Sequence, residues 1–192
     1  MNGRYEDNTA RRRALRQEMV ARRAALSDGE HAALSACIVA HALAALARPS
    51  VAAFCWPIRH EPDVRGLLAR WTAAGSRAAL PVVIAEDAPL RFREWTPDVR
   101  LAADRYGIPT PTAGDWLTPD LILLPLNGFD GAGYRLGYGG GYFDRTLAAL
   151  APRPLAVGVG FEINRVDSIR PEAHDQRLDW IVTEDGAFTP AA

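Results

Sequence analysis

The 192-residue sequence contains no lysine, so all 22 of its basic residues are arginine. This absence excludes a Schiff-base mechanism, which needs a lysine amine. It also excludes the Walker phosphate-binding loop, which needs Gly-Lys-Ser or Gly-Lys-Thr. Positive charge is not in excess either, since the formal net charge is −1. A chain with this charge has no positive electrostatic field that would attract nucleic acid, and we expect no nucleic-acid partner.

Cysteines and long apolar runs are scarce as well. Only Cys37 and Cys55 are present, both in apolar surroundings, and a reduced state in the cytoplasm is the simplest interpretation. No apolar run approaches the ~20 residues of a membrane span, and the first residues lack the apolar core of a secretory signal. We therefore expect a cytoplasmic protein without membrane association. The length suits one domain over residues 1–192, with the polar residues 1–8 as a disordered tail.

Glycine is concentrated in one short stretch. Of the 16 glycines, those at positions 128, 131, 133, 137, 139, 140 and 141 fall close together. The apolar run 121–124 before them is typical of a strand buried on both faces of a parallel sheet. After them, Phe143, Leu147 and Leu150 recur at helical spacing. A strand, a glycine loop and a helix N-terminus together form an anion site, and phosphate is the first candidate.

The glycine spacing alone leaves alternatives open. The stretch from Gly137 misses the pattern G-x-G-x-x-G because its sixth position is Tyr142. A glycine-rich surface turn without a chemical role is therefore one interpretation. Against it, Arg135, Asp144 and Arg145 stand beside the glycines, and charged loops on a strand–helix scaffold are usually functional. Two reasons could account for the glycines: the backbone takes φ angles that other residues disfavour, or a ligand approaches the backbone closely.

Strand patterns alternate with helix patterns along the rest of the chain. Helices are predicted over residues 9–26, 28–47, 62–75 and 142–150, and Ser27 to Glu30 reads as a capping box. Strands are predicted over residues 51–56, 78–84, 90–95, 121–124, 155–160 and 178–183. This order predicts an α/β fold, a three-layer α/β/α sandwich around a mostly parallel sheet.

The segment from Phe129 to Arg145 closely resembles the motif of the 5-formyltetrahydrofolate cyclo-ligases, also called methenyltetrahydrofolate synthetases. Other landmarks of the family follow in order: an arginine-rich first helix, a Pro-x-x-x-Glu segment ending at Glu61, Gly107-Ile108-Pro109, and His174-Asp175. The resemblance covers nearly the whole chain. It implies an ATP-dependent cyclisation of 5-formyltetrahydrofolate to 5,10-methenyltetrahydrofolate, with release of ADP and phosphate, through a phosphorylated formyl intermediate.

The resemblance also implies roles for individual residues. ATP would be bound by Arg12, Arg16, Arg135, Leu136, Gly137, Tyr138, Gly139, Gly140, Gly141, Tyr142 and Phe143. The folate would be bound by Trp56, Glu61, Tyr138, Gly139, Gly140, Gly141 and Tyr142. Asp144 and Asp175 would hold Mg²⁺, and the catalytic residues would be Arg135, Arg145 and Tyr142.

Three departures from the family pattern fall within this set. Arg12 stands in place of a lysine, and its planar fork differs from a compact ammonium. Tyr138 and Gly140 stand where some members carry basic residues. The neutralisation of phosphate would then depend on other arginines.

Two alternatives to this enzyme remain at the level of the sequence. One is a homologue that binds nucleotide or folate without turnover. The other is an enzyme of similar architecture, such as a sugar-phosphate isomerase or a CoA transferase, which would not need ATP. The expected partners are 5-formyltetrahydrofolate and MgATP, and we expect a monomer.

Overall fold

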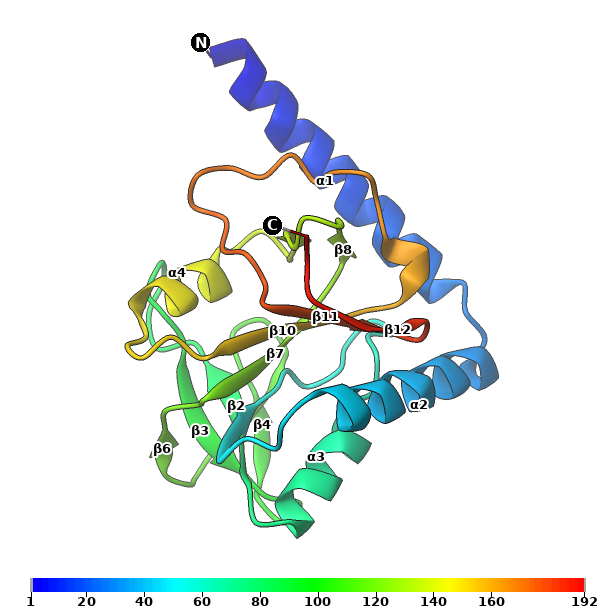
Figure 1. The fold of residues 1–192 in the computed structure, drawn as a ribbon. Helices are drawn as coiled ribbons and strands as arrows, with labels where there is room; N and C mark the ends of the chain where they lie inside the picture. The colour runs from blue at the N-terminus through cyan, green and yellow to red at the C-terminus, as the bar shows by residue number, and fades with distance from the viewer. Residues whose placement is uncertain (1, 192) are drawn as a thin grey trace.

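The computed structural model describes residues 2–191, with side chains from residue 8 onward. Its centre is an eight-stranded sheet in the order β12-β11-β10-β7-β1-β2-β3-β6 (Figure 1). The strands are β1 (Val51–Ala53), β2 (Arg77–Val82), β3 (Arg91–Trp95), β6 (Trp116–Leu117), β7 (Leu121–Pro125), β10 (Leu155–Val159), β11 (Trp180–Thr183) and β12 (Gly186–Phe188). β11, β10, β7, β1 and β2 pair in parallel, whereas β12, β3 and β6 are antiparallel to their neighbours. The prediction of a mostly parallel sheet is confirmed.

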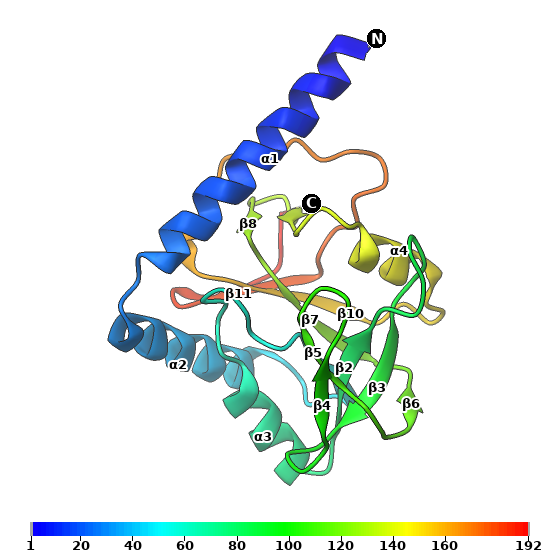
Figure 2. The same cartoon turned by 180° about the vertical axis from the view of Figure 1, so that it is seen from behind.

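The helices form layers on both faces of this sheet. They are α1 (Asn2–Ala24), α2 (Asp28–Ala45), α3 (Arg65–Ala73), α4 (Tyr142–Ala149) and the short 3₁₀ helix η1 (Glu162–Asn164). α2 and α3 cover one face and α4 covers the other, while α1 lies across one end of the sheet (Figures 1 and 2). This arrangement confirms the predicted α/β fold. None of the helices among residues 2–191 has the length and apolar character needed to cross a membrane.

The two faces of β7 enter different parts of the core. Leu121 and Leu123 belong to the cluster that packs against α2 and α3. Ile122 and Leu124 belong to the cluster that includes Leu147 of α4. All four β7 leucine and isoleucine side chains are buried, which is why this run shows no polar alternation.

Several boundaries differ from the predicted ones. α1 begins at Asn2, so the prediction of a disordered tail over residues 1–8 is wrong for residues 2–8, which are helical. Met1 lies outside the described residues. β1 ends at Ala53 instead of residue 56, because the chain leaves the sheet before Trp56. The capping box is confirmed. The Ser27 side chain accepts from the Glu30 backbone N–H, and the Glu30 carboxylate accepts from the Ser27 backbone N–H.

Two small hairpins were not predicted. β4 (Leu101–Ala103) pairs with β5 (Pro109–Pro111), and β8 (Gly128–Phe129) pairs with β9 (Arg135–Leu136). The second hairpin lies inside the glycine-rich stretch and divides it. Only the part from residue 137 to 141 forms the loop that leads into α4.

Candidate active site

A cavity of about 610 Å³ opens beside the carboxyl ends of the parallel strands. Trp56 beyond β1, Val83 beyond β2 and Pro125 at the end of β7 contribute to its walls. Further walls come from α1, the segment 104–109, the glycine loop 137–141 with its flanking residues, and the segment 172–175. Open α/β sheets bind their ligands at this edge, and the volume lies in the range of small-molecule sites.

Most of the predicted site residues line this cavity. They are Arg12, Arg16, Trp56, Glu61, Arg135, Gly137, Tyr138, Gly139, Gly140, Gly141, Tyr142, Phe143, Asp144 and Asp175. Leu136 does not, since its side chain is fully buried in β9. Arg145 does not line it either: its Nη2 donates to the Gly140 carbonyl at 2.6 Å and lies 3.5 Å from a carboxylate oxygen of Asp87. The catalytic role predicted for Arg145 stays a prediction, with its guanidinium placed on the loop in this structure.

The backbone of the glycine loop requires glycine at two positions. Gly139 has φ +98° and Gly141, the N-cap of α4, has φ +63°, so both take left-handed backbone that disfavours side chains. Gly140 is not in this region. Arg16 fixes the loop from α1, because its Nε donates to the Gly137 carbonyl at 2.8 Å.

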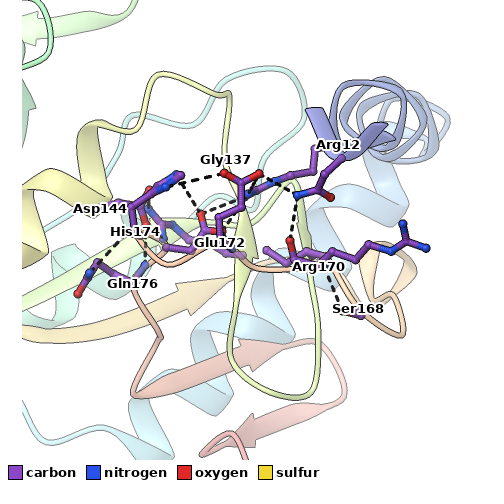
Figure 3. Close-up of polar contacts among 12 residues, drawn as sticks. Arg12, Gly137, Asp144, Ser168, Arg170, Glu172, His174 and Gln176 are labelled. Carbon is purple, nitrogen blue, oxygen red and sulfur yellow. Dashed lines mark hydrogen bonds and ion pairs between the residues drawn. The ribbon is translucent and has the colours of Figure 1, made fainter. Parts of the chain in front are cut away.

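Two aspartates stand at the cavity, each held by an arginine fork. Asp144 accepts from both Nη atoms of Arg135, at 3.0 and 3.3 Å, and its Oδ1 also accepts from the Gln176 backbone N–H at 3.0 Å. Asp175 accepts from Arg12 at 2.9 and 3.0 Å (Figure 3). Burial raises the pKa of Asp175, but the hydrogen bonds from Arg12 and the Glu172 backbone outweigh it and lower this pKa below its usual value.

The segment 170–175 that carries Asp175 is itself anchored to α1. Asn8 donates to the Glu172 carboxylate at 2.8 Å, and Arg11 donates to the Ser168 carbonyl at 2.9 Å (Figure 3). Arg12 therefore acts together with its neighbours on the helix to hold this wall in place. The first helix thus shapes the cavity and does not merely present a solvated basic face.

Glu61 is the buried acid of the cavity. Its side chain is almost fully shielded, and its Oε1 accepts from the Tyr138 hydroxyl at 2.7 Å while its Oε2 accepts from the Ile58 backbone N–H at 3.1 Å. Burial raises the pKa of Glu61, and these hydrogen bonds offset the effect only in part. Glu61 thus lies within contact of Tyr138, a residue of the glycine loop.

Two side chains of this region were absent from the predicted site residues. The Tyr106 hydroxyl lies 2.8 Å from that of Tyr142 at the cavity, although its segment reads only as a turn. Arg23 is fully buried behind the cavity. It stands four residues after the buried Met19, and this place on the apolar stripe of the first helix was the available indication.

These features define the class of protein: an α/β protein with a candidate small-molecule site in a cavity at the carboxyl edge of a mostly parallel sheet, beside a glycine loop. Residues 8–184 match the 5-formyltetrahydrofolate cyclo-ligase family, and the chain belongs to this family. The resemblance noted in the sequence is thereby confirmed, and with it the prediction that the chain is an enzyme.

Individual relatives agree with this assignment. The chain is 31% identical over 137 residues to the 5-formyltetrahydrofolate cyclo-ligase of Mycolicibacterium smegmatis, covering 66% of this chain and 70% of the relative. It is 33% identical over 130 residues to that of Escherichia coli strain K12, covering 64% and 71%.

Solved structures give the same result over more of the chain. The 5,10-methenyltetrahydrofolate synthetase of Aquifex aeolicus superposes with a TM-score of 0.79 at 28% identity, covering 94% of this chain and 93% of that one. The synthetase of Mycoplasma pneumoniae gives 0.74 at 26%, covering 90% and 98%.

The backbone of the glycine loop predicts a different outcome for alanine at each position. Gly139→Ala and Gly141→Ala should each lower the free energy of unfolding by about 1 kcal/mol or more, because alanine disfavours their φ angles. Gly140→Ala should cost less, since its φ is not left-handed and its new Cβ, 2.9 Å from Cδ2 of Tyr142, requires a shift of that ring alone. Thermal melts of the three variants measure this, and an early melt of Gly140→Ala alone would contradict the described loop.

Proposed function

We propose that the chain catalyses the ATP-dependent cyclisation of 5-formyltetrahydrofolate to 5,10-methenyltetrahydrofolate, with release of ADP and phosphate. The observation that carries this proposal is that one cavity holds both a glycine loop suited to phosphate and a buried acid suited to a pterin. The 2.7 Å hydrogen bond between Tyr138 and Glu61 brings the two parts into contact. Membership of the cyclo-ligase family supports the same reaction.

The nucleotide phosphates would lie against the glycine loop and the N-terminus of α4. Backbone N–H groups and the helix dipole both favour an anion there. Arg16 is the cation best placed to receive it, since no carboxylate among residues 8–191 pairs with Arg16, whereas Arg12 and Arg135 already hold aspartates. Arg16 and Arg135 therefore replace, in our proposal, the basic residues that some relatives carry at positions 138 and 140.

The folate would place its pterin against Glu61. The amide and amine edge of a pterin presents hydrogen-bond donors, and a buried carboxylate is their natural acceptor. Trp56 and Ile108 supply apolar surface on the same cavity. Glu61 and Trp56 therefore belong to the folate side and the glycine loop to the nucleotide side, with Tyr138 between them.

The chemistry needs positioning more than a protein nucleophile. The formamide oxygen is a poor leaving group, so it first takes the γ-phosphoryl group of ATP, ADP departs, and a phosphorylated imine forms. N10 of the folate then attacks the activated carbon, its proton passes to the departing phosphate, and phosphate leaves with the former formyl oxygen. Loose phosphoryl transfer of this kind is accelerated by alignment and charge neutralisation. Arg135 and Tyr142 border the space where the phosphoryl group would move.

The cavity offers Mg²⁺ two carboxylates, whose oxygens it would share with the forks of Arg12 and Arg135. Asp144 and Asp175 both face the cavity, and no group of three or more His, Cys, Asp or Glu suited to a metal occurs among the described residues. Mg²⁺ characteristically binds through one or two carboxylates together with water and substrate phosphates, so two aspartates suffice. We propose that Asp144 and Asp175 hold it, and that when bound it neutralises charge on the nucleotide phosphates.

The direct test of the proposed reaction is the rise in methenyl absorbance when the enzyme meets 5-formyltetrahydrofolate. We expect this rise with MgATP and not without it. A folded protein that binds both ligands and gives no product would favour the inactive homologue. Product formed without ATP would contradict the proposed mechanism.

The aspartate assignment predicts the behaviour of Asp144→Asn. Turnover should fall roughly 10- to 100-fold, and the Mg²⁺ concentration needed for half-maximal rate should rise, because one carboxylate ligand is lost. Asp115→Asn, at an exposed carboxylate paired with Arg77 away from the cavity, is the matched control. If Asp144→Asn loses activity with an unchanged Mg²⁺ requirement, its carboxylate serves only to hold Arg135.

The folate assignment predicts the behaviour of Glu61→Gln. Loss of a charge-assisted hydrogen bond should weaken folate binding by roughly 1.5–3 kcal/mol, with little change in the KM for ATP. Because burial raises the pKa of Glu61, the wild type should lose kcat/KM for folate on the acid side at a pH above the ordinary glutamate value of 4.5. The glutamine variant should lack this acid limb. Equal weakening of both substrates would show that Glu61 only shapes the turn.

A further inference from the structure

Arg23 presents an unusual problem for the fold, because its guanidinium is removed from water without a carboxylate partner. Its side chain is fully buried, and no ion pair to it occurs among residues 8–191. A buried charge of this kind is unfavourable unless other groups satisfy it. The positions of its acceptors therefore indicate what the residue is for.

Two of the three acceptors belong to residues that line the cavity, and the third belongs to Asn127 in the core beside it. Nε donates to the Arg59 carbonyl at 2.9 Å, Nη1 to the Asn127 side chain at 3.0 Å, and Nη2 to the Tyr138 hydroxyl at 3.3 Å. Arg59 lies in the turn that leads to Glu61, Asn127 follows β7, and Tyr138 belongs to the glycine loop. One guanidinium thus joins three segments that are distant in the sequence.

The contact with Tyr138 fixes the direction of a hydrogen bond. A tyrosine hydroxyl has one proton, and when it accepts from Arg23 that proton is free to point at another acceptor. Here the acceptor is Oε1 of Glu61, at 2.7 Å. Burial and the nearby carboxylate raise the pKa of Tyr138, so its proton is retained. The hydrogen bonds therefore run in one direction: Arg23 donates to Tyr138, and Tyr138 donates to Glu61.

The contact of Arg23 with the Arg59 carbonyl acts on the turn that carries the same carboxylate. Arg59 and His60 both have left-handed φ angles, +49° and +56°, which are uncommon for residues other than glycine. Strained backbone of this kind persists only where its surroundings hold it. Arg23 holds the Arg59 carbonyl, and the turn that contains Arg59 and His60 directs Glu61 into the cavity.

We propose that Arg23 is a positioning residue for the binding of folate. Arg23 acts through Tyr138 and the Arg59 turn, and it fixes the place and ionised state of the Glu61 carboxylate. It does not touch the substrate. The inference rests on the proposed function, in which Glu61 receives the pterin. A lysine would not replace Arg23, because a single ammonium does not reproduce the planar fork that reaches three acceptors.

A double-mutant cycle tests this inference. The variants are Arg23→Met, Tyr138→Phe and the double variant, with Arg23→Lys as the conservative change. Arg22→Met is the matched control, since its arginine is a neighbour on α1 that pairs with Glu18 at the surface. For each variant, kcat and the KM of both substrates are measured after circular dichroism has established the folded fraction.

We expect Arg23→Met to raise the KM for folate at least about 10-fold and to leave the KM for ATP within about twofold. In the Tyr138→Phe background the same change should add clearly less than in the wild type, because only one route to Glu61, the contact with the Arg59 turn, is then left to lose. If Arg23→Met does not fold, Arg23→Lys decides: it should raise the KM for folate while the KM for ATP stays constant. Arg22→Met should match the wild type in both KM values.

Additive effects in the cycle would overturn the inference, and so would a folded Arg23→Lys with a wild-type KM for folate. An equal rise in both KM values, or a loss of stability with unchanged KM values in the folded fraction, would reduce Arg23 to a structural role. These outcomes are distinct from failure of the proposed function. A wild-type enzyme without methenyl formation would overturn that function, whereas an active wild type with an additive cycle overturns the inference alone.

Discussion

The parallel pairing of β1, β7 and β10 is the constraint on which the rest of the molecule depends. β7 lies between the other two, with Leu121 opposite both Ala52 and Leu155. Parallel strands end at the same edge of a sheet, so the segments that follow them must emerge side by side. The turn to Glu61 and the glycine loop meet for this reason, although they are far apart in the sequence.

Arginine alone supplies the positive charge at this edge, and each arginine is fixed differently. Arg12 and Arg135 hold aspartates in two-pronged contacts, and Arg16 holds the carbonyl of Gly137. Arg23 holds three neutral oxygens behind the cavity wall. A guanidinium presents several donors in one rigid plane, so it can position protein groups and still offer charge to a ligand. The walls of the cavity are thus organised by the same residue type that would receive the phosphates.

Much of this arrangement was predictable from local pattern. The unbroken apolar run of β7, the Ser27 capping box and the helix after the glycines depend on neighbours in the sequence, and all three are confirmed. Most of the residues that the family resemblance singled out also line the cavity. The roles of these residues, together with ATP, Mg²⁺ and the monomeric state, remain predictions.

What local pattern could not reveal depends on long-range contacts. The pairing of β8 with β9 is not encoded by any strand pattern, since both strands are two residues long. The motif assigns Arg145 a catalytic role, but only the folded chain shows that its guanidinium donates to the Gly140 carbonyl of the loop. The burial of Arg23 likewise depends on acceptors from three segments that only the folded chain assembles.

The central claim is that one cavity accommodates a nucleotide and a folate at the same time, and equilibrium binding tests it most directly. The wild-type enzyme would be saturated with a non-hydrolysable ATP analogue and Mg²⁺, then titrated calorimetrically with 5-formyltetrahydrofolate. The account predicts that one folate binds per chain with the analogue still in place, at an affinity equal to or higher than that of the free enzyme. Displacement of the analogue by the folate would contradict it, because the two ligands would then compete for a single position.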